Sequence, residues 1–529
     1  MNTLKIYTKP VRDRRTYPSA LAQSVHMSLD GKALNFDYGI LFPRAEISAE
    51  NTILERGIKE PKIARAGGTV YIFGDFCDHE GTVLCSDKAC LWTTADFSGF
   101  EEVGLVNKAD YTDIFAAGTC EIELTDAERG NILSILAPIE FESVDVPESV
   151  EIRDLSELRN VTATVKYSDG STDVKPINWN LDGVPASGSF EVTGEIEVKD
   201  YPFPGPSGFA DPVFYKRDGK WYLLATNDNT GDVGMYIKCA ESVEGLFSEE
   251  SKWVCILPYD ESRNFVQTFW APEFHEIGGE LYILFAVGGK QWAPHSHMMK
   301  LKHGGDIMDP NGWEEPKRVV RADGSELYPR GITLDMTFFR ANGKAYLMWS
   351  ERRFDPDTGS MISIAEIDEK TPWILKSEPV LIARPLFGWE NQAGTVNNEG
   401  PYPLMLGDKI RIAYSGGAAG GYSYVIGWLT AENGADLLDP KSWKKQLWAA
   451  AQTQMYRDRE GVGHNSFFTG DDGKLYIAYH AQPIGEDNHR CTGAHRVHIG
   501  KNGEPRFDLY PEADLPKDKR RVTVKVTVK

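Results

Sequence analysis

The sequence contains 529 residues, of which 41% are hydrophobic and 26% are charged, and its formal net charge at pH 7 is -21. This length predicts two or three domains, and the 50 glycines and 29 prolines favour short strands joined by turns over long helices. The negative charge disfavours nucleic acids, anionic membranes and polyanionic polysaccharides as partners, whereas neutral ligands are compatible with it. Solubility alone also explains such a charge.

The cysteines and the first residues bear on the cellular compartment. Seven cysteines occur without a Cys-x-x-Cys pair, so we expect reduced thiols rather than a disulfide framework or a zinc ribbon. The sequence starts without the apolar segment of a secretory signal, and it contains no run of about 18 apolar residues. We therefore expect a cytoplasmic chain, or a secreted one if a signal has been removed. The oligomeric state is left open.

Residues 1–142 are predicted to form an accessory β-module. Residues 62–76 have the pattern of a hairpin, with two alternating apolar strands around a glycine turn. Glu60 and Pro61 precede this hairpin as Asp211 and Pro212 precede a later copy of the same pattern. The module is therefore expected to contain a divergent repeat unit that packs on the later repeats or partly completes them.

Residues 143–198 differ from their surroundings, because they contain short β-rich runs and no cluster of catalytic residue types. The turn at 167–170, Trp179 and the segment 188–195 resemble bacterial immunoglobulin-like domains. We expect an inserted β-sandwich here that acts as a spacer or as a prop between domains.

Five further hairpin patterns follow, at 213–226, 274–287, 338–350, 403–415 and 467–480. Polar residues stand just before them at intervals of 62, 62, 64 and 65 residues, namely Asp211, Glu273, Asp335, Glu399 and His464. The first strand of each blade lines the channel of a β-propeller, so polar residues at one offset would converge on the axis. We predict an all-β protein in which residues 199–529 form a five-bladed β-propeller.

A ring of carboxylates around a channel suits glycoside hydrolysis. Inversion needs one protonated carboxyl group that assists the leaving group and one ionised carboxylate that activates water. Burial and like-charged neighbours can separate the pKa values of such groups. Asp335 is the most suggestive of the acids, because apolar residues flank it on both sides, whereas Asp211 and Glu399 stand beside prolines where turns also place acids.

Three motifs resemble glycoside hydrolase family 43 in their order and spacing, over residues from about 205 to 510: ADPVFYKRDGKWYLLAT, TLDMTFFRANGKAYLMWS and NNEGPYPLMLGDKIRIAYS. The resemblance implies an inverting mechanism in which Asp211 is the general base, Asp335 modulates the pKa of the acid and orients it, and Glu399 is the general acid. The segments FWAPEF and GVGHNSFF match the family as well. They imply that His464 holds a calcium ion or an ordered water in the channel, and no organic cofactor is expected.

Further residues are predicted to contact the sugar. Glu273 is a fourth acid of the ring, and Trp270 beside it could form a wall for a sugar ring, although core packing explains the same position. Trp292 and Trp389 lie in predicted loops between blades, where aromatic side chains often meet substrate. The resemblance also implies an arginine that reaches the sugar from the last blade, and strand alternation selects Arg496.

Together these features predict an exo-acting hydrolase that releases a terminal neutral sugar, most simply α-L-arabinofuranose, from plant-derived oligosaccharides or polysaccharides. A β-xylosidase is the neighbouring alternative, and a non-catalytic carbohydrate-binding propeller is the alternative from another class. A fructan hydrolase is disfavoured because the Asn-Asp-Pro motif near a strand start is missing. Long loops at 288–297 and 386–398 favour a closed pocket over an open groove.

Overall fold

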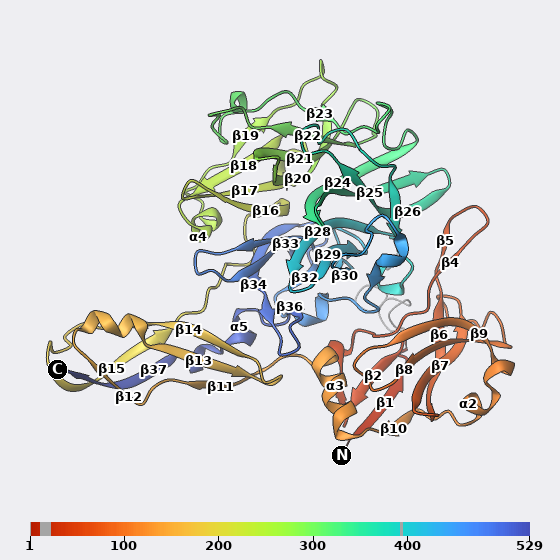
Figure 1. Cartoon of the computed structure of the whole chain (residues 1–529), viewed down its shortest axis with the longest axis horizontal. Coiled ribbons are helices and arrows are strands. Elements are labelled where there is room, and N and C mark those ends of the chain that lie inside the picture. The colour runs from red at the N-terminus through yellow and green to blue at the C-terminus, as the bar shows by residue number, and fades with distance from the viewer. Residues whose placement is uncertain (1, 11–22, 392–394) are drawn as a thin grey trace.

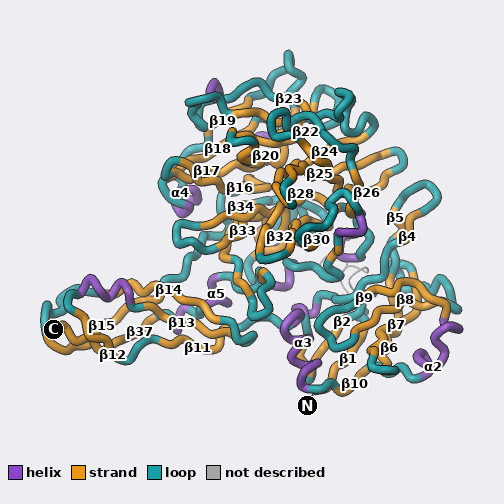
Figure 2. The backbone as a smooth tube through the Cα atoms, viewed as in Figure 1, coloured by secondary structure: helices purple, strands orange, loops and turns teal. Residues whose placement is uncertain are grey.

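The computed structural model describes residues 2–10, 23–391 and 395–529. Strands dominate, and the chain forms a central propeller, an N-terminal module beside it and a β-module that projects from it as an arm (Figures 1 and 2). Within the described residues the longest helix is α3 (Asp126–Leu136), and none of the helices there could span a membrane.

The N-terminal module contains two four-stranded sheets. The first has the order β10-β1-β2-β3, with the bounds β1 (Thr3–Tyr7), β2 (His26–Leu29), β3 (Lys32–Ala33) and β10 (Glu121–Glu123). The second is consecutive and antiparallel, with the bounds β6 (Gly57–Ala66), β7 (Thr69–Cys77), β8 (Lys88–Thr94) and β9 (Glu101–Asn107). The β6–β7 pair is the hairpin that the sequence predicts at 62–76. A short hairpin, β4 (Glu46–Ile47) and β5 (Ile53–Leu54), extends toward the propeller (Figure 1).

Two short helices accompany these sheets, α2 (Thr112–Ala116) and the longer α3. Helix α3 starts with a capping box, in which the Thr125 hydroxyl accepts a hydrogen bond from the Glu128 N–H and the Glu128 carboxylate accepts one from the Thr125 N–H. The box satisfies backbone donors that the first helical turn would otherwise leave unpaired.

The β-module is one six-stranded arrangement in the order β11-β13-β14-β15-β37-β12. Its strands are β11 (Phe141–Asp145), β12 (Ser149–Ile152), β13 (Thr162–Tyr167), β14 (Thr172–Trp179), β15 (Gly188–Ile196) and β37 (Arg521–Val528). Strand β37 pairs antiparallel with β15 and parallel with β12, and its valines alternate with polar residues so that every second side chain is buried. Residues 521–528 therefore lie in this module, which corrects the expected extension of the propeller to residue 529.

The propeller consists of five sheets that follow one another along the chain. Four are four-stranded and antiparallel. The first blade contains β16 (Phe209–Arg217), β17 (Lys220–Asn227), β18 (Met235–Ala240) and β19 (Val254–Leu257), and the second contains β20 (Gln267–Ile277), β21 (Glu280–Gly288), β22 (His295–Lys300) and β23 (Lys317–Arg318). The third blade contains β24 (Gly331–Ala341), β25 (Lys344–Phe354), β26 (Asp357–Ile367) and β27 (Val380–Ala383), and the fourth contains β28 (Asn398–Leu406), β29 (Lys409–Gly416), β30 (Val425–Glu432) and β31 (Lys444–Lys445). The fifth has three strands, β32 (Arg459–Thr469), β33 (Leu475–Pro483) and β34 (Cys491–Arg496).

The five sheets close into a ring. Their first strands touch in the cyclic order β16, β20, β24, β28, β32 and back to β16, and each neighbouring pair of blades shares a hydrophobic cluster. The chain that precedes β16 completes the fifth blade, because Ser207 bridges to Cys491 and the Gly205 N–H donates to the Thr492 carbonyl. Two further short strands, β35 (His498–Ile499) and β36 (Pro505–Arg506), follow the ring.

Each first strand of the propeller contains a bulge with a left-handed residue. These residues are Asp211, Ala271, Asp335, Gly400 and His464, with φ between 44° and 56°. A bulge turns the bulged side chain relative to the regular ladder, and such strained backbone is concentrated at functional sites. The predicted polar ring therefore follows the bulge only in part: Glu273 lies two residues after its bulge position and Glu399 one residue before. Strand β6 has the same bulge at Glu60, whose φ is 49°, although its sheet lies outside the ring.

Candidate active site

Asp211 lies at the bulge of β16 and is buried, with hydrogen-bond partners on both oxygens. Its Oδ1 lies 2.9 Å from Nδ1 of His480 and 3.6 Å from a guanidinium nitrogen of Arg490. The Thr226 hydroxyl accepts from the Ala271 N–H at 2.8 Å, so its own proton is free to be donated to Oδ2 of Asp211 at 2.6 Å. Asp211 is thus held in one orientation by Thr226 of the first blade, by His480 of the fifth blade and by Arg490 in the loop before β34.

The surroundings of Asp211 keep it ionised. Burial alone would raise its pKa, but the positive charges of His464 and Arg490 and the hydrogen bond from His480 hold that pKa well below the ordinary value. Nδ1 of His464 is 3.3 Å from the carboxylate. A carboxylate in this state can accept a proton but has none to donate.

Asp335 and Glu399 have the opposite tendency. Burial, together with the negative charge of Asp211, raises the pKa of Asp335 to about 6 against the charge of His464. Burial and the neighbouring charge of Asp335 raise the pKa of Glu399 to about 7. Oδ2 of Asp335 accepts a hydrogen bond of 3.0 Å from the N–H of Gly400, the residue after Glu399, and so fixes the backbone that carries this acid.

Two remaining members of the predicted ring have different partners. His464 faces Asp211, and the charges of the four surrounding acids raise its pKa although burial opposes them. Glu273 is buried and lies 2.6 Å from Nε2 of His275. The structure therefore brings Asp211, Glu273, Asp335, Glu399 and His464 into one electrostatically coupled cluster, as the sequence predicts.

The expected calcium ion stays a prediction. Calcium prefers several oxygen ligands, whereas the ring of His464 offers a nitrogen and is directed at the Asp211 carboxylate. Among the described residues, no group of three or more His, Cys, Asp or Glu side chains is arranged to hold a metal ion.

The residues predicted to contact the sugar differ in their exposure to solvent. Trp270 is half-buried, and its Nε1 donates to Asp232 at 2.8 Å, while the ring of Trp292 lies 6.4 Å away and is 47% exposed. Trp389 is fully buried between blades and donates to the carbonyl of Leu447, so its predicted role at the substrate is wrong.

Arg496 is also misplaced in the sequence prediction. Its guanidinium pairs with Asp173 of the β-module, on the outer side of the fifth blade. The arginine that reaches the cluster is Arg490, which precedes β34 and donates to Asp228 as well as facing Asp211. The arginine side chain that faces the cluster therefore stands in the loop before β34 and not on the strand.

Two aromatic residues that sequence reasoning missed connect Asp211 with Glu399. The Tyr424 hydroxyl donates to Oε1 of Glu399 at 2.9 Å, and His480 lies against Asp211. Their rings stack with centroids 5.1 Å apart and planes 8° apart, and both side chains are fully buried. Nε2 of His480 lies 2.8 Å from the Ala419 carbonyl, in the loop that leads to Tyr424. A polar residue ending the apolar run LYIAYH was the available signal for His480.

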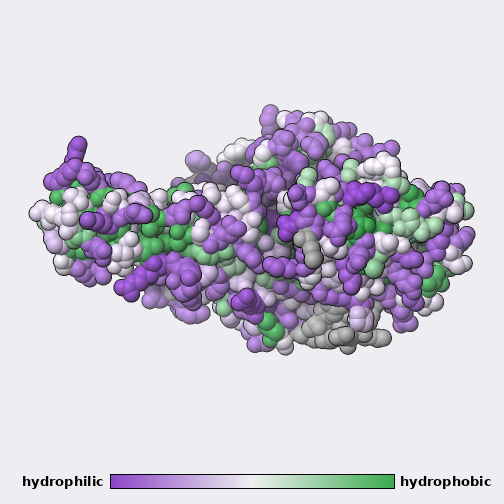
Figure 3. Space-filling view, turned by 90° about the horizontal axis from the view of Figure 1, so that it is seen from below, coloured by the Kyte–Doolittle hydropathy of each residue, from purple (hydrophilic) through white to green (hydrophobic). Residues whose placement is uncertain are grey.

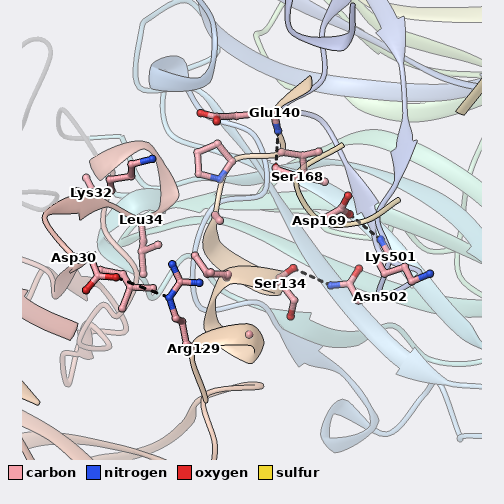
Figure 4. Close-up of a pocket in the computed structure, with 17 residues that line it drawn as sticks. Asp30, Lys32, Leu34, Arg129, Ser134, Glu140, Ser168, Asp169, Lys501 and Asn502 are labelled. Carbon is pink, nitrogen blue, oxygen red and sulfur yellow. Dashed lines mark hydrogen bonds and ion pairs between the residues drawn. The ribbon is translucent and has the colours of Figure 1, made fainter. Parts of the chain in front are cut away.

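A large cavity lies elsewhere, at the seam between the three parts of the chain (Figure 4). It has a volume of about 910 Å³ and is lined by helix α3, the β2–β3 turn, the turn at 168–169 and the hairpin at 501–502. Its polar groups largely bind one another, since Asn502 donates to the Ser134 carbonyl and the Lys501 N–H to Asp169. None of the clustered acids lines it, so we assign it to the joint between the modules.

Residues 257–505 match the sequence family described as Glycosyl hydrolases family 43. The chain is 32% identical over 320 residues to Alpha-L-arabinofuranosidase B of Pyricularia oryzae. This match covers 58% of this chain and 62% of that protein. It is 30% identical over 342 residues to an Extracellular exo-alpha-(1->5)-L-arabinofuranosidase of Streptomyces avermitilis, and this match covers 62% of this chain and 66% of that protein. The match thus spans slightly less than two thirds of either relative. The crystal structure of alpha-L-arabinofuranosidase from Lactobacillus brevis is similar with a TM-score of 0.51 and 28% identity, over 58% of this chain and 96% of that one.

Proposed function

We propose, from the match of residues 257–505 to glycosyl hydrolases family 43, that this chain is an inverting, exo-acting α-L-arabinofuranosidase. The observation that supports the proposal is the cluster of carboxyl groups in which the pKa of Asp211 is lowered while the pKa values of Asp335 and Glu399 are raised. Relatives that are 32% and 30% identical are named as α-L-arabinofuranosidases and support the choice of sugar.

The proposed mechanism assigns one proton transfer to each of two carboxyl groups. Asp211, ionised, accepts a proton from the water that attacks the anomeric carbon. Glu399, protonated below a pKa of about 7, donates its proton to the departing glycosidic oxygen. Asp335 touches neither reacting atom: its charge keeps the acid protonated, and its bond to the Gly400 N–H positions the acid.

The substrate is proposed to be a neutral plant-derived oligosaccharide or polysaccharide, in keeping with the charge of -21. Trp270, Glu273, Trp292 and Arg490 are proposed to contact the substrate, and Arg490 replaces Arg496 in this role. A β-xylosidase is the alternative within the same mechanism. The non-catalytic alternative is disfavoured, because a binding site has no need of acids whose pKa values are driven apart.

The β-module is proposed to be an immunoglobulin-like sandwich that acts as a prop. Lys175 of β14 pairs with Asp173 at 2.9 Å and with Asp514 at 2.6 Å, all three being buried. Asp514 belongs to the segment that leaves the propeller, in the short helix α5 (Pro511–Asp514), so the ion pairs join module and propeller.

A screen of nitrophenyl glycosides of arabinofuranose, xylopyranose and galactopyranose tests the sugar, and NMR of the first anomer released tests inversion. We expect cleavage of the arabinofuranoside with inverted product. Asp211→Asn and Glu399→Gln are expected to lose nearly all turnover of natural oligosaccharides and to keep the thermal unfolding of the parent. Asp218→Asn, an exposed aspartate of the same first blade, is the matched control. A retained anomer, or undiminished turnover in both variants, contradicts the proposal.

A further inference from the structure

Three aromatic side chains form a row across the second and third blades. The ring of Trp292 lies 6.4 Å from that of Trp270 at 68°, and 5.5 Å from that of Phe354 at 62°. Trp292 stands in the loop between β21 and β22, and Phe354 is the last residue of β25. Their exposed fractions are 47% and 43%, so two large rings that touch each other are left open to solvent. Adjacent exposed aromatic rings are typical of ligand-binding surfaces.

The inner end of the row belongs to the catalytic cluster. Trp270 precedes Ala271, whose N–H donates to the Thr226 hydroxyl that in turn donates to Asp211. The Trp270 ring packs against the small cluster of Ala286, Ile332 and Leu334, and its Nε1 donates to Asp232. A ring fixed by packing on one side and by a hydrogen bond on the other offers a preformed surface next to the reacting bond.

The outer end of the row is tied to the acid. The Arg352 guanidinium lies 5.5 Å from the centroid of the Phe354 ring and is held by both oxygens of Asp357, at 3.0 and 2.6 Å. The same guanidinium donates to Oδ1 of Asn397 at 3.2 Å, two residues before Glu399. The outer ring is therefore fixed to the segment that carries the proposed general acid.

This connection gives the row a direction. The general acid protonates the oxygen of the leaving group, so the part of the substrate that departs lies on the side of Glu399. We propose that Trp270, Trp292 and Phe354 bind the leaving-group portion of the substrate, and that this portion is a chain of at least two sugar units. The inference rests on the proposed function for its orientation.

The substrate class follows from the length and character of the row. The C–H faces of neutral sugar rings are apolar and fit aromatic surfaces, and a row of three neighbouring rings offers such a surface to more than one sugar unit. The enzyme is thus expected to remove the terminal unit of an oligosaccharide or polymer in preference to small aryl or alkyl glycosides.

The test compares substrates of increasing length. Wild type, Trp292→Ala, Phe354→Ala and the double variant are assayed on nitrophenyl arabinofuranoside and on arabino-oligosaccharides of two to five units. Leu381→Ala, an exposed apolar residue of β27 in the same blade as Phe354, is the matched control. We expect KM to rise about five- to tenfold per removed ring for three or more units, with kcat little changed, and we expect Phe354→Ala to leave the nitrophenyl substrate unaffected. Variants that follow the control at every length overturn the inference.

A binding measurement separates this inference from the proposed function. Glu399→Gln, with and without the two ring truncations, is titrated calorimetrically with arabinan- and xylan-derived pentasaccharides. Affinity that falls on truncation supports the row even if the released sugar is not arabinose. Affinity that is unchanged by truncation, or no binding of either pentasaccharide by Glu399→Gln, overturns the inference whichever glycoside the wild type cleaves.

Discussion

The hydroxyl of Tyr424 is expected to set the upper pH limit of the reaction. It donates to Oε1 of Glu399 at 2.9 Å and favours the ionised form of that acid, opposing the burial that raises its pKa to about 7. Tyr424→Phe removes the donor and keeps the ring that stacks on His480. The pKa of Glu399 should therefore rise further, and the acid should stay protonated to higher pH.

The size of the shift follows from the strength of such a bond. A hydrogen bond to a charged group contributes about 1.5 to 3 kcal/mol, and one pKa unit corresponds to about 1.4 kcal/mol. The smaller figure moves the pKa of Glu399 from about 7 to about 8. At pH 8 the protonated fraction then rises from about 9% to about 50%, which is about a fivefold gain in the reactive form.

The assay is the pH profile of kcat/KM on an arabino-oligosaccharide, read by the arabinose released. A sugar leaving group needs protonation, whereas nitrophenolate departs readily without it, so the natural substrate reports the acid. Tyr215→Phe, which removes a hydroxyl bonded to Glu276 far from the cluster, controls for the loss of a tyrosine hydroxyl. A basic limb that stays in place, or one that moves to lower pH, refutes the reasoning.

Three further outcomes are expected. Asp335→Asn removes the negative charge beside Glu399, so the basic limb of the same profile should move about one unit to lower pH, opposite to Tyr424→Phe; a shift upward contradicts the role given to Asp335. Arg490→Met removes a positive charge that lowers the pKa of Asp211, so the acidic limb, which this low pKa places below about pH 4, should move upward; an unmoved limb speaks against that pairing. Lys175→Met leaves the buried Asp514 without its cation, while Asp173 keeps Arg496 and Lys474 as partners, and it should destabilise the fold by about 3 kcal/mol in thermal unfolding, with kcat unchanged; an unaltered Tm contradicts it.

The repeat of hairpins and acids was sufficient to predict the ring, because each repeat has two alternating apolar strands around a glycine turn. Asp211, Asp335 and Glu399 were predicted for the same reason, since they stand beside the first strand of their blades. The bulge was not predictable from this spacing. It makes Ala271 and Gly400 the structural equivalents of Asp211, and it displaces Glu273 and Glu399 by a residue or two.

The remaining site residues come from positions without a repeat signal. Arg490 stands in a loop, and Tyr424 follows a glycine-rich segment, so their approach to the carboxylates depends on how two loops fold back over the channel. Trp389 shows the converse, because a tryptophan in an apparent loop is enclosed when the N-terminal module packs Tyr38 and Phe42 into the same cluster. Contacts between modules are invisible to periodicity within one of them.

The β-module cannot complete its pairing until strand β37, near the C-terminal end of the sequence, has been synthesised. Strand β12 has only this partner among its ladders within the described residues, and β15 offers its free edge to the same strand. The ribosome makes β15 more than 320 residues before β37. The edge of β15 that pairs with β37 therefore stays unpaired while the whole propeller is synthesised. During that interval the unpaired edge of β15 is available to any other extended chain, and Figure 3 shows hydrophobic side chains among the polar ones along this arm. A nascent or truncated chain that lacks residues 521–528 should therefore aggregate through the arm even when its propeller is folded.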